Sequence, residues 1–187
     1  MWPDDLIVLA AWALQSEDLR HRFIHAASPS DLLTTPGLTD AFETAAVLAI
    51  YEAARHKGYV YNKTILYECP YYPDASGIGP RSDLGFKATG PGQNWALVEA
   101  KYYSAAGIQA DVAKLRTIER RVQRWMLVYR VIALPDPSAA KRGRPIESLE
   151  NLMGQWATWG EPRTRSFATI ASSGNPGQCE VFLGRLL

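Results

Sequence analysis

The stretch NWALVEAKYY, residues 94–103, decides the fold. Side chains alternate between the two faces of a strand, so Val98 and Ala100 point into a core. Glu99 and Lys101 then project together from the other face. Opposite charges at alternate positions are typical either of a solvated strand face or of a polar site. The segments on either side of this strand help to choose between the two.

Residues 83–89 (DLGFKAT) predict a second strand, and Gly90-Pro91-Gly92 predicts a hairpin that joins it to residues 94–103. In such a hairpin Asp83 approaches Glu99 and Lys101. Two converging carboxylates repel each other unless a cation bridges them, and Mg²⁺ prefers oxygen ligands. The pattern therefore predicts a magnesium site suited to phosphodiester hydrolysis, in which Lys101 holds a water or neutralises developing charge.

The rest of the chain predicts a single mixed α/β domain over residues 1–187. Hydrophobic periodicity predicts helices at 4–14, 17–27, 40–57, 108–122 and 147–159, and strands at 61–69, 124–134, 163–172 and 178–184. In the helix at 108–122, one apolar face is formed by Ile108, Val112, Leu115 and Val122. We divide the chain into a helical extension (1–38), a catalytic core (39–134) and C-terminal additions (135–187).

Composition excludes several classes of protein. With 20 basic and 19 acidic residues the formal net charge is +1, which excludes a uniformly basic nucleic-acid coat. Cys69 and Cys179 are too few for a disulfide framework. The N-terminus is acidic where a signal peptide is basic, and no apolar run reaches the length of a membrane span. We expect a soluble cytoplasmic protein without a membrane partner.

The charge is polarised along the chain. Residues 1–54 contain 2 basic and 8 acidic residues, whereas residues 55–187 contain 18 and 11. The interval from Lys114 to Arg144 contains nine basic and two acidic residues. Lys114 and Arg121 lie seven residues apart, opposite the apolar face of their predicted helix. We expect phosphate contacts from Lys114, Arg121, Arg142 and Arg144, with DNA as the partner and RNA left open.

Asp83, followed after 15 residues by Glu99-Ala100-Lys101 on an apolar strand, resembles the PD-(D/E)XK nuclease superfamily. The predicted order over residues 40–134 is similar to the αβββαβ core of its restriction-endonuclease-like fold, a mixed central sheet flanked by helices. The resemblance implies a Mg²⁺-dependent nuclease in which Mn²⁺ can substitute. It implies that Asp83, Glu99 and the Ala100 carbonyl bind the metal, and that Lys101 positions the attacking water. Because many relatives act as dimers, a homodimer is left open.

Several alternatives remain open at this point. The family often has a glutamate on the preceding helix, which is Glu43 or Glu52 here, and we favour Glu43. Asp74 follows a proline but lies in a loop rich in glycine and proline, so we favour Asp83. The polar residue of the following helix is Gln109, Asp111 or Lys114. The chain could instead be a non-catalytic nucleic-acid-binding or interaction module of this fold, or an unrelated α/β protein.

Overall fold

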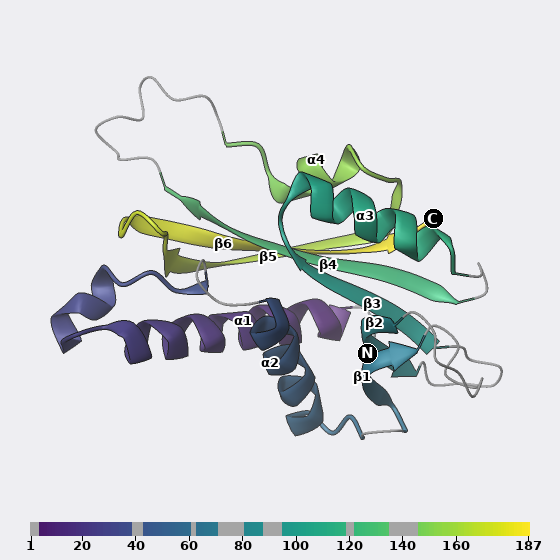
Figure 1. The fold of residues 1–187 in the computed structure, drawn as a ribbon, viewed down its shortest axis with the longest axis horizontal. Coiled ribbons are helices and arrows are strands. Elements are labelled where there is room, and N and C mark those ends of the chain that lie inside the picture. The colour runs from purple at the N-terminus through teal and green to yellow at the C-terminus, as the bar shows by residue number, and fades with distance from the viewer. Residues whose placement is uncertain are drawn as a thin grey trace.

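Figure 1 presents the computed structural model of the protein, which describes residues 4–38, 43–60, 63–70, 81–87, 95–118, 122–134 and 146–187. The strands are β1 (Ile65–Pro70), β2 (Arg81–Lys87), β3 (Trp95–Tyr102), β4 (Gln123–Ala133), β5 (Trp159–Ile170) and β6 (Pro176–Leu186). They form one six-stranded sheet in the order β1-β2-β3-β4-β6-β5. The helices are α1 (Asp4–His25), the short 3₁₀ helix η1 (Pro29–Leu33), α2 (Glu43–His56), α3 (Ala105–Arg116) and α4 (Leu149–Gly154).

Helices cover both faces of the sheet. In Figure 1, α1 and α2 lie below the sheet and α3 and α4 lie above it. The apolar core is divided in the same way: Val98 and Ala100 pack in the cluster that includes α1 and α2, and Leu97 packs in the cluster that includes α3 and α4. The prediction of a mixed α/β fold is therefore confirmed, and the alternation of side chains along β3 is as expected.

Strand β3 pairs with different geometry on its two sides. It runs antiparallel to β2, with Leu84 opposite Val98, so the strands predicted at 83–89 and 94–103 do pair. On its other side it runs parallel to β4, with Val98 opposite Trp125. Parallel neighbours need a crossover connection, and α3 provides it. This crossover places α3 over the face of β3 from which Glu99 projects.

Three element predictions are wrong. The helix predicted at 147–159 is shorter, because α4 spans only Leu149–Gly154 and β5 already begins at Trp159. Residues 4–25 form one continuous helix, not two, because Gln15 and Ser16 are exposed polar residues that a helix tolerates. Helix α3 begins earlier than predicted, at the Ser104 cap, and ends at Arg116. Val122 therefore lies outside the helix, just before β4, and Arg121 lies outside the described residues. None of the helices in the described part of the chain is long and apolar enough to cross a membrane.

A buried carboxylate joins α1 to the far edge of the sheet. Asp18 is only 1% exposed, and its Oδ1 accepts hydrogen bonds from the backbone N–H of Leu38 at 3.1 Å and from the hydroxyl of Thr169 on β5. Arg22 Nε lies 3.3 Å from Asp18 Oδ2. Gly37 makes this approach possible, since a Cβ there would lie 1.8 Å from the same carboxylate oxygen.

Removing this carboxylate should destabilise the fold. Asp18→Ala leaves a largely buried arginine without its counter-charge, so we expect a loss of about 3–5 kcal/mol in the free energy of unfolding by urea. Thr169→Val removes one donor and should cost less, about 1–3 kcal/mol. Glu52→Ala, which removes a carboxylate of α2 whose side chain is 47% exposed, is the control and should leave the unfolding midpoint nearly unchanged. Equal midpoints for Asp18→Ala and Glu52→Ala would contradict this account.

Candidate active site

The candidate site forms where β2 and β3 stop pairing. The register of the two strands ends at Leu84 opposite Val98, so Asp83 is the next residue beyond the paired segment. Its Oδ2 accepts a hydrogen bond of 2.7 Å from the backbone N–H of Ala100. The Asp83 side chain thus takes an acceptor position on the edge of β3, immediately beside Glu99. The sequence-based expectation that Asp83 approaches Glu99 agrees with this geometry.

Glu99 is a buried carboxylate held by a lysine. It is 3% exposed, and Lys114 Nζ of α3 lies 2.8 Å from its Oε1. Burial raises the pKa of Glu99 to about 7, against the opposing effect of the hydrogen bond from Lys114 and with a further rise from the charge of Asp83. Burial likewise raises the pKa of Asp83, although the hydrogen bond from Ala100 acts in the other direction. Glu99 therefore does not belong to a solvated strand face.

Lys101 lies between two other carboxylates. Its Nζ is 2.9 Å from Glu43 Oε1, at the start of α2, and 3.5 Å from Asp111 Oδ2 on α3. Burial alone would lower the pKa of Lys101, but the hydrogen bond to Glu43 and the charge of Asp111 outweigh burial, and the pKa is raised. Glu43 also accepts from the backbone N–H of Tyr102 at 3.4 Å. Lys101 is thus held by one carboxylate from α2 and one from α3, which lie on opposite faces of the sheet.

A glycine that the sequence analysis did not single out makes room for this lysine. A Cβ on Gly107 of α3 would lie 3.0 Å from Lys101 Cε and 2.6 Å from the Oγ of Ser104, the residue that caps the helix. Larger side chains at this position would push against the stem of Lys101. No sequence signal distinguished Gly107, because a glycine in the first turn of a helix has many explanations.

The structure separates the alternatives for the helix carboxylate. Glu43 meets Lys101, whereas the Glu52 side chain is 47% exposed and lies 3.7 Å from Arg55 of the same helix. On the following helix, Asp111 and Lys114 both reach the site, while Gln109 is exposed.

One expectation about α3 is wrong. Lys114 does not point outward opposite the apolar face, because its ammonium reaches in to Glu99. Helix α3 also ends at Arg116, before the end of the helix predicted over 108–122. The expectations for Arg121, Arg142, Arg144 and Asp74 fall outside the described residues.

The cluster carries an excess of negative charge. Four carboxylates (Glu43, Asp83, Glu99 and Asp111) surround two ammonium groups (Lys101 and Lys114), so the formal sum is −2 when all six are ionised. Within the described ranges, no three Asp, Glu, His or Cys side chains converge as a metal-binding group. A cluster of this kind can bind a cation through its carboxylates and can offer an ammonium group to an anionic substrate.

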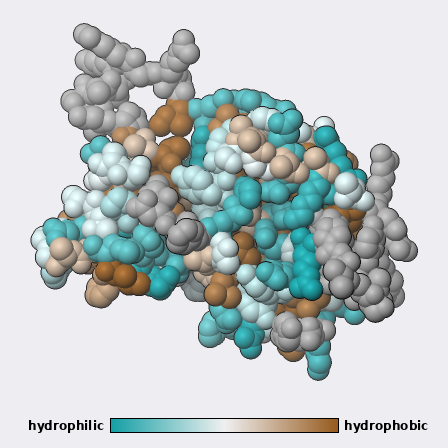
Figure 2. All heavy atoms as spheres, in the orientation of Figure 1, coloured by the Kyte–Doolittle hydropathy of each residue, from teal (hydrophilic) through white to brown (hydrophobic). Residues whose placement is uncertain are grey.

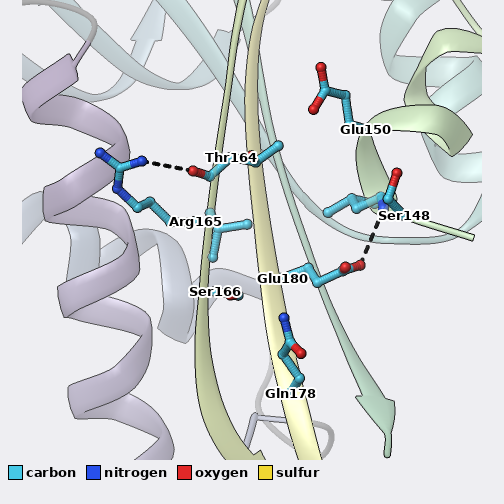
Figure 3. A pocket seen from close by; sticks show the side chains of 9 residues that line it. Ser148, Glu150, Thr164, Arg165, Ser166, Gln178 and Glu180 are labelled. Atoms are coloured by element: carbon cyan, nitrogen blue, oxygen red, sulfur yellow. Dashed lines mark hydrogen bonds between the residues drawn. The ribbon is translucent and has the colours of Figure 1, made fainter. Parts of the chain in front are cut away.

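A separate hollow of about 340 Å³ lies between α4 and the strands β5 and β6 (Figure 3). Its polar lining includes Glu180, whose carboxylate accepts from the backbone N–H of Leu149 at 3.2 Å and is paired with Arg130. In Figure 3 the Arg165 side chain extends toward α1, and its Nη1 donates a hydrogen bond of 3.0 Å to the backbone carbonyl of Thr164. None of the predicted site residues lines this hollow, and its buried charge is already balanced.

The raised pKa of Glu99 predicts how stability depends on pH in the metal-free protein. Between the ordinary value of 4.5 and about 7, folded Glu99 keeps a proton that the unfolded chain has lost. The contribution of protonated Glu99 to the free energy of unfolding is therefore complete below pH 4.5 and is lost as the pH rises to about 7. In urea unfolding with a chelator present, Glu99→Gln should reduce this downward slope. The exposed-residue control Glu52→Gln should keep the wild-type slope, and equal slopes for all three proteins would contradict the assignment.

Comparisons of the chain with protein-family models, with curated proteins and with solved structures gave no match. The functional proposal below therefore rests on the residues and geometry of the site.

Proposed function

We propose that this chain is a metal-dependent nuclease of the restriction-endonuclease-like fold, which hydrolyses phosphodiester bonds of DNA. The observation that carries the proposal is that Asp83 lies beside Glu99 where β2 and β3 diverge, while Lys101, two residues further along β3, is bonded to Glu43 and lies near Asp111. The element order α2-β1-β2-β3-α3-β4, with β3 central and parallel to β4, supports the proposed fold.

The residues present fit a divalent cation. Asp83 and Glu99 offer hard carboxylate oxygens, and Mg²⁺ commonly takes one or two carboxylates together with waters and substrate phosphate. With all six groups ionised, the surrounding cluster has a formal charge of −2, which a cation of charge +2 would balance. Asp83 and Glu99 would hold Mg²⁺ or Mn²⁺, and the Ala100 carbonyl remains a proposed third ligand. The bound ion would polarise a phosphoryl oxygen and lower the pKa of a bound water.

The proposed catalytic role of Lys101 is to donate hydrogen bonds from its ammonium group. Nζ can orient an attacking water and can stabilise the negative charge that develops on the phosphoryl oxygens. Glu43 and Asp111 act as positioning residues, since they hold Nζ from opposite sides at 2.9 and 3.5 Å. A lysine side chain has many rotamers, so fixing it before the reaction removes an entropic cost from the transition state.

Lys114 has a proposed role in substrate binding. Its ammonium lies 2.8 Å from Glu99 Oε1, and its side chain is still 37% exposed. If the ammonium turned from Glu99 toward the substrate, it could donate a hydrogen bond to a phosphate oxygen. The sequence interval from Lys114 to Arg144, with nine basic and two acidic residues, supports a nucleic acid as the substrate.

One observation favours a second candidate function. The carboxylates of Asp83 and Glu99 both have partners within the protein: Asp83 accepts a hydrogen bond from the Ala100 N–H, and Glu99 is paired with Lys114. A non-catalytic nucleic-acid-binding module of the same fold would have this arrangement, with the lysine as a permanent substitute for the cation. The two functions differ in a measurable way, because the module binds DNA without cleaving it in the presence of any divalent ion.

Cleavage of plasmid and linear DNA with Mg²⁺ or Mn²⁺ tests the proposal. Lys101→Met should lower the cleavage rate by about 10²–10³-fold, the usual cost of removing one charge-stabilising donor. Asp83→Asn should lower it at least as much, because a neutral amide is a poor ligand for Mg²⁺. Single-stranded and duplex RNA, assayed in parallel, identify the class of nucleic acid.

The matched control is Glu52→Gln, which removes one carboxylate from the exposed side of α2 and should leave the rate unchanged. DNA binding measured with a non-supporting ion such as Ca²⁺ separates loss of chemistry from loss of affinity. Equal cleavage by wild type, Asp83→Asn and Lys101→Met would refute the nuclease assignment. Binding without cleavage under both ions would favour the non-catalytic module.

A further inference from the structure

Strands β2 and β3 separate at the candidate active site and form a fork. Their pairing with each other ends at Leu84 opposite Val98. Beyond this point β2 still pairs with β1, and β3 still pairs with β4. We name residues 81–83 the β2 arm of the fork and residues 99–102 the β3 arm. Because each arm is hydrogen-bonded to its outer neighbour, both arms belong to the sheet and hold their side chains in fixed directions.

The two arms carry a basic residue at matching positions. Lys101 lies two residues after Glu99 on the β3 arm, and Arg81 lies two residues before Asp83 on the β2 arm. Side chains two positions apart on a strand share a face, so Arg81 projects from the face of β2 that carries Asp83, about 7 Å along the strand. The burial pattern agrees, since Arg81 is exposed and the intervening Ser82 is buried. The two carboxylates at the base of the fork are therefore flanked by a basic side chain on each arm.

Arg81 is held much less firmly than the two lysines of the charge cluster. Lys101 and Lys114 lie 2.9 and 2.8 Å from their carboxylates. Arg81 Nη1 lies 3.7 Å from Glu68 Oε2 of β1, and these two side chains are 55% and 60% exposed. Exposed ion pairs contribute about 0–1 kcal/mol. Exchange of Glu68 for another anion therefore costs Arg81 little.

Glu68, the partner of Arg81, has an uncommon backbone conformation beside the fork. By the register of β1 with β2 it lies opposite Asp83, and its φ is +48°. Few residues other than glycine adopt this left-handed region, and those that do are held there by the surrounding structure, often at functional sites. The direction of β1 side chains changes here, because Tyr67 packs with the cluster of α1 and α2 whereas Cys69 belongs to the cluster of α3 and α4. The conformation of Glu68 supports a functional role for this edge of the fork.

We propose that Arg81 is a further substrate-binding residue, whose guanidinium contacts a phosphate of the nucleic acid next to the phosphate that is cleaved. This inference rests on the proposed nuclease function. Arginine binds phosphate through two parallel hydrogen bonds, whereas Glu68 at 3.7 Å lies beyond hydrogen-bond distance. With a divalent ion bound the charge cluster is formally neutral, so attraction for a polyanion comes from basic side chains around it. Hydrophilic side chains predominate across the middle of the molecule in Figure 2, between α3 and α2, which suits a charged partner.

DNA binding by the full chain tests this role without cleavage. Affinity is measured by fluorescence anisotropy of a labelled oligonucleotide in Ca²⁺ at several salt concentrations. Arg81→Ala should raise Kd by about three- to tenfold and reduce the slope of log Kd against log salt by about 1, because one phosphate contact is lost. Arg81→Lys should keep the wild-type slope but recover only part of the affinity, because an ammonium lacks the paired donors. Glu68→Gln should lower Kd, since it removes the anion that competes with phosphate.

The matched control is Arg55→Ala. Arg55 is 50% exposed and also forms an ion pair of 3.7 Å, with Glu52, but it lies in the last turn of α2, about 18 Å along the helix from Glu43. It should keep the wild-type Kd and salt slope. In cleavage assays with Mg²⁺, Arg81→Ala should raise KM and leave kcat nearly unchanged, because the contact is made equally before and during the reaction.

The outcomes separate this inference from the proposed function. If Arg81→Ala binds DNA as Arg55→Ala does, Arg81 is not a substrate-binding residue, whether or not wild type cleaves DNA. A lower kcat for Arg81→Ala with an unchanged Kd would also overturn the inference. A wild-type protein that neither binds nor cleaves nucleic acid would refute the proposed function, and this inference with it.

Discussion

The burial of strand β3 on both faces is the constraint on which the rest of the structure depends. Every residue from Trp95 to Ala100 is buried, so helices must cover the sheet on both sides. The parallel pairing of β3 with β4 then requires a crossover, and α3 provides it over the face that carries Glu99. A buried carboxylate needs a counter-charge, and Lys114 of the same crossover helix lies 2.8 Å from it. The fold and the charge cluster therefore arise from one arrangement.

Much of this framework could be predicted from local sequence. The hairpin partners β2 and β3, the buried strand β4 and the helix before β1 follow from periodicity and turn residues, which are local signals. The continuity of α1 did not follow, because a helix with two apolar faces has no single hydrophobic stripe. The end of α3 was misplaced for a related reason. Val122 keeps the helical spacing of Ile108 and Leu115, but tertiary packing places it at the entrance to β4.

The candidate site shows the same division between local and long-range information. The approach of Asp83 to Glu99 could be predicted from one hairpin, and the placement of Lys101 on the same face of β3 as Glu99 from strand alternation. The choice of Glu43 over Glu52 depends on where α2 begins relative to β3. No local sequence pattern specifies this position, and the structure places Glu43 2.9 Å from Lys101. Lys114 was expected on the outer surface, although it lies about one turn after Asp111, which also reaches the site, and directly before the buried Leu115. Long side chains at such positions can reach inward.

The central proposal is that Asp83 and Glu99 bind a divalent cation and that Lys114 gives up its contact with Glu99 when the cation binds. A crystal structure of the protein grown with Mn²⁺ tests it most directly, because the anomalous signal locates the ion without reference to activity. The account predicts one Mn²⁺ bound to the carboxylates of Asp83 and Glu99, with Lys114 displaced from its 2.8 Å contact and Lys101 still held by Glu43. A structure with Lys114 still bonded to Glu99 and no ion between the two carboxylates, at a Mn²⁺ concentration that saturates ordinary carboxylate sites, would contradict it.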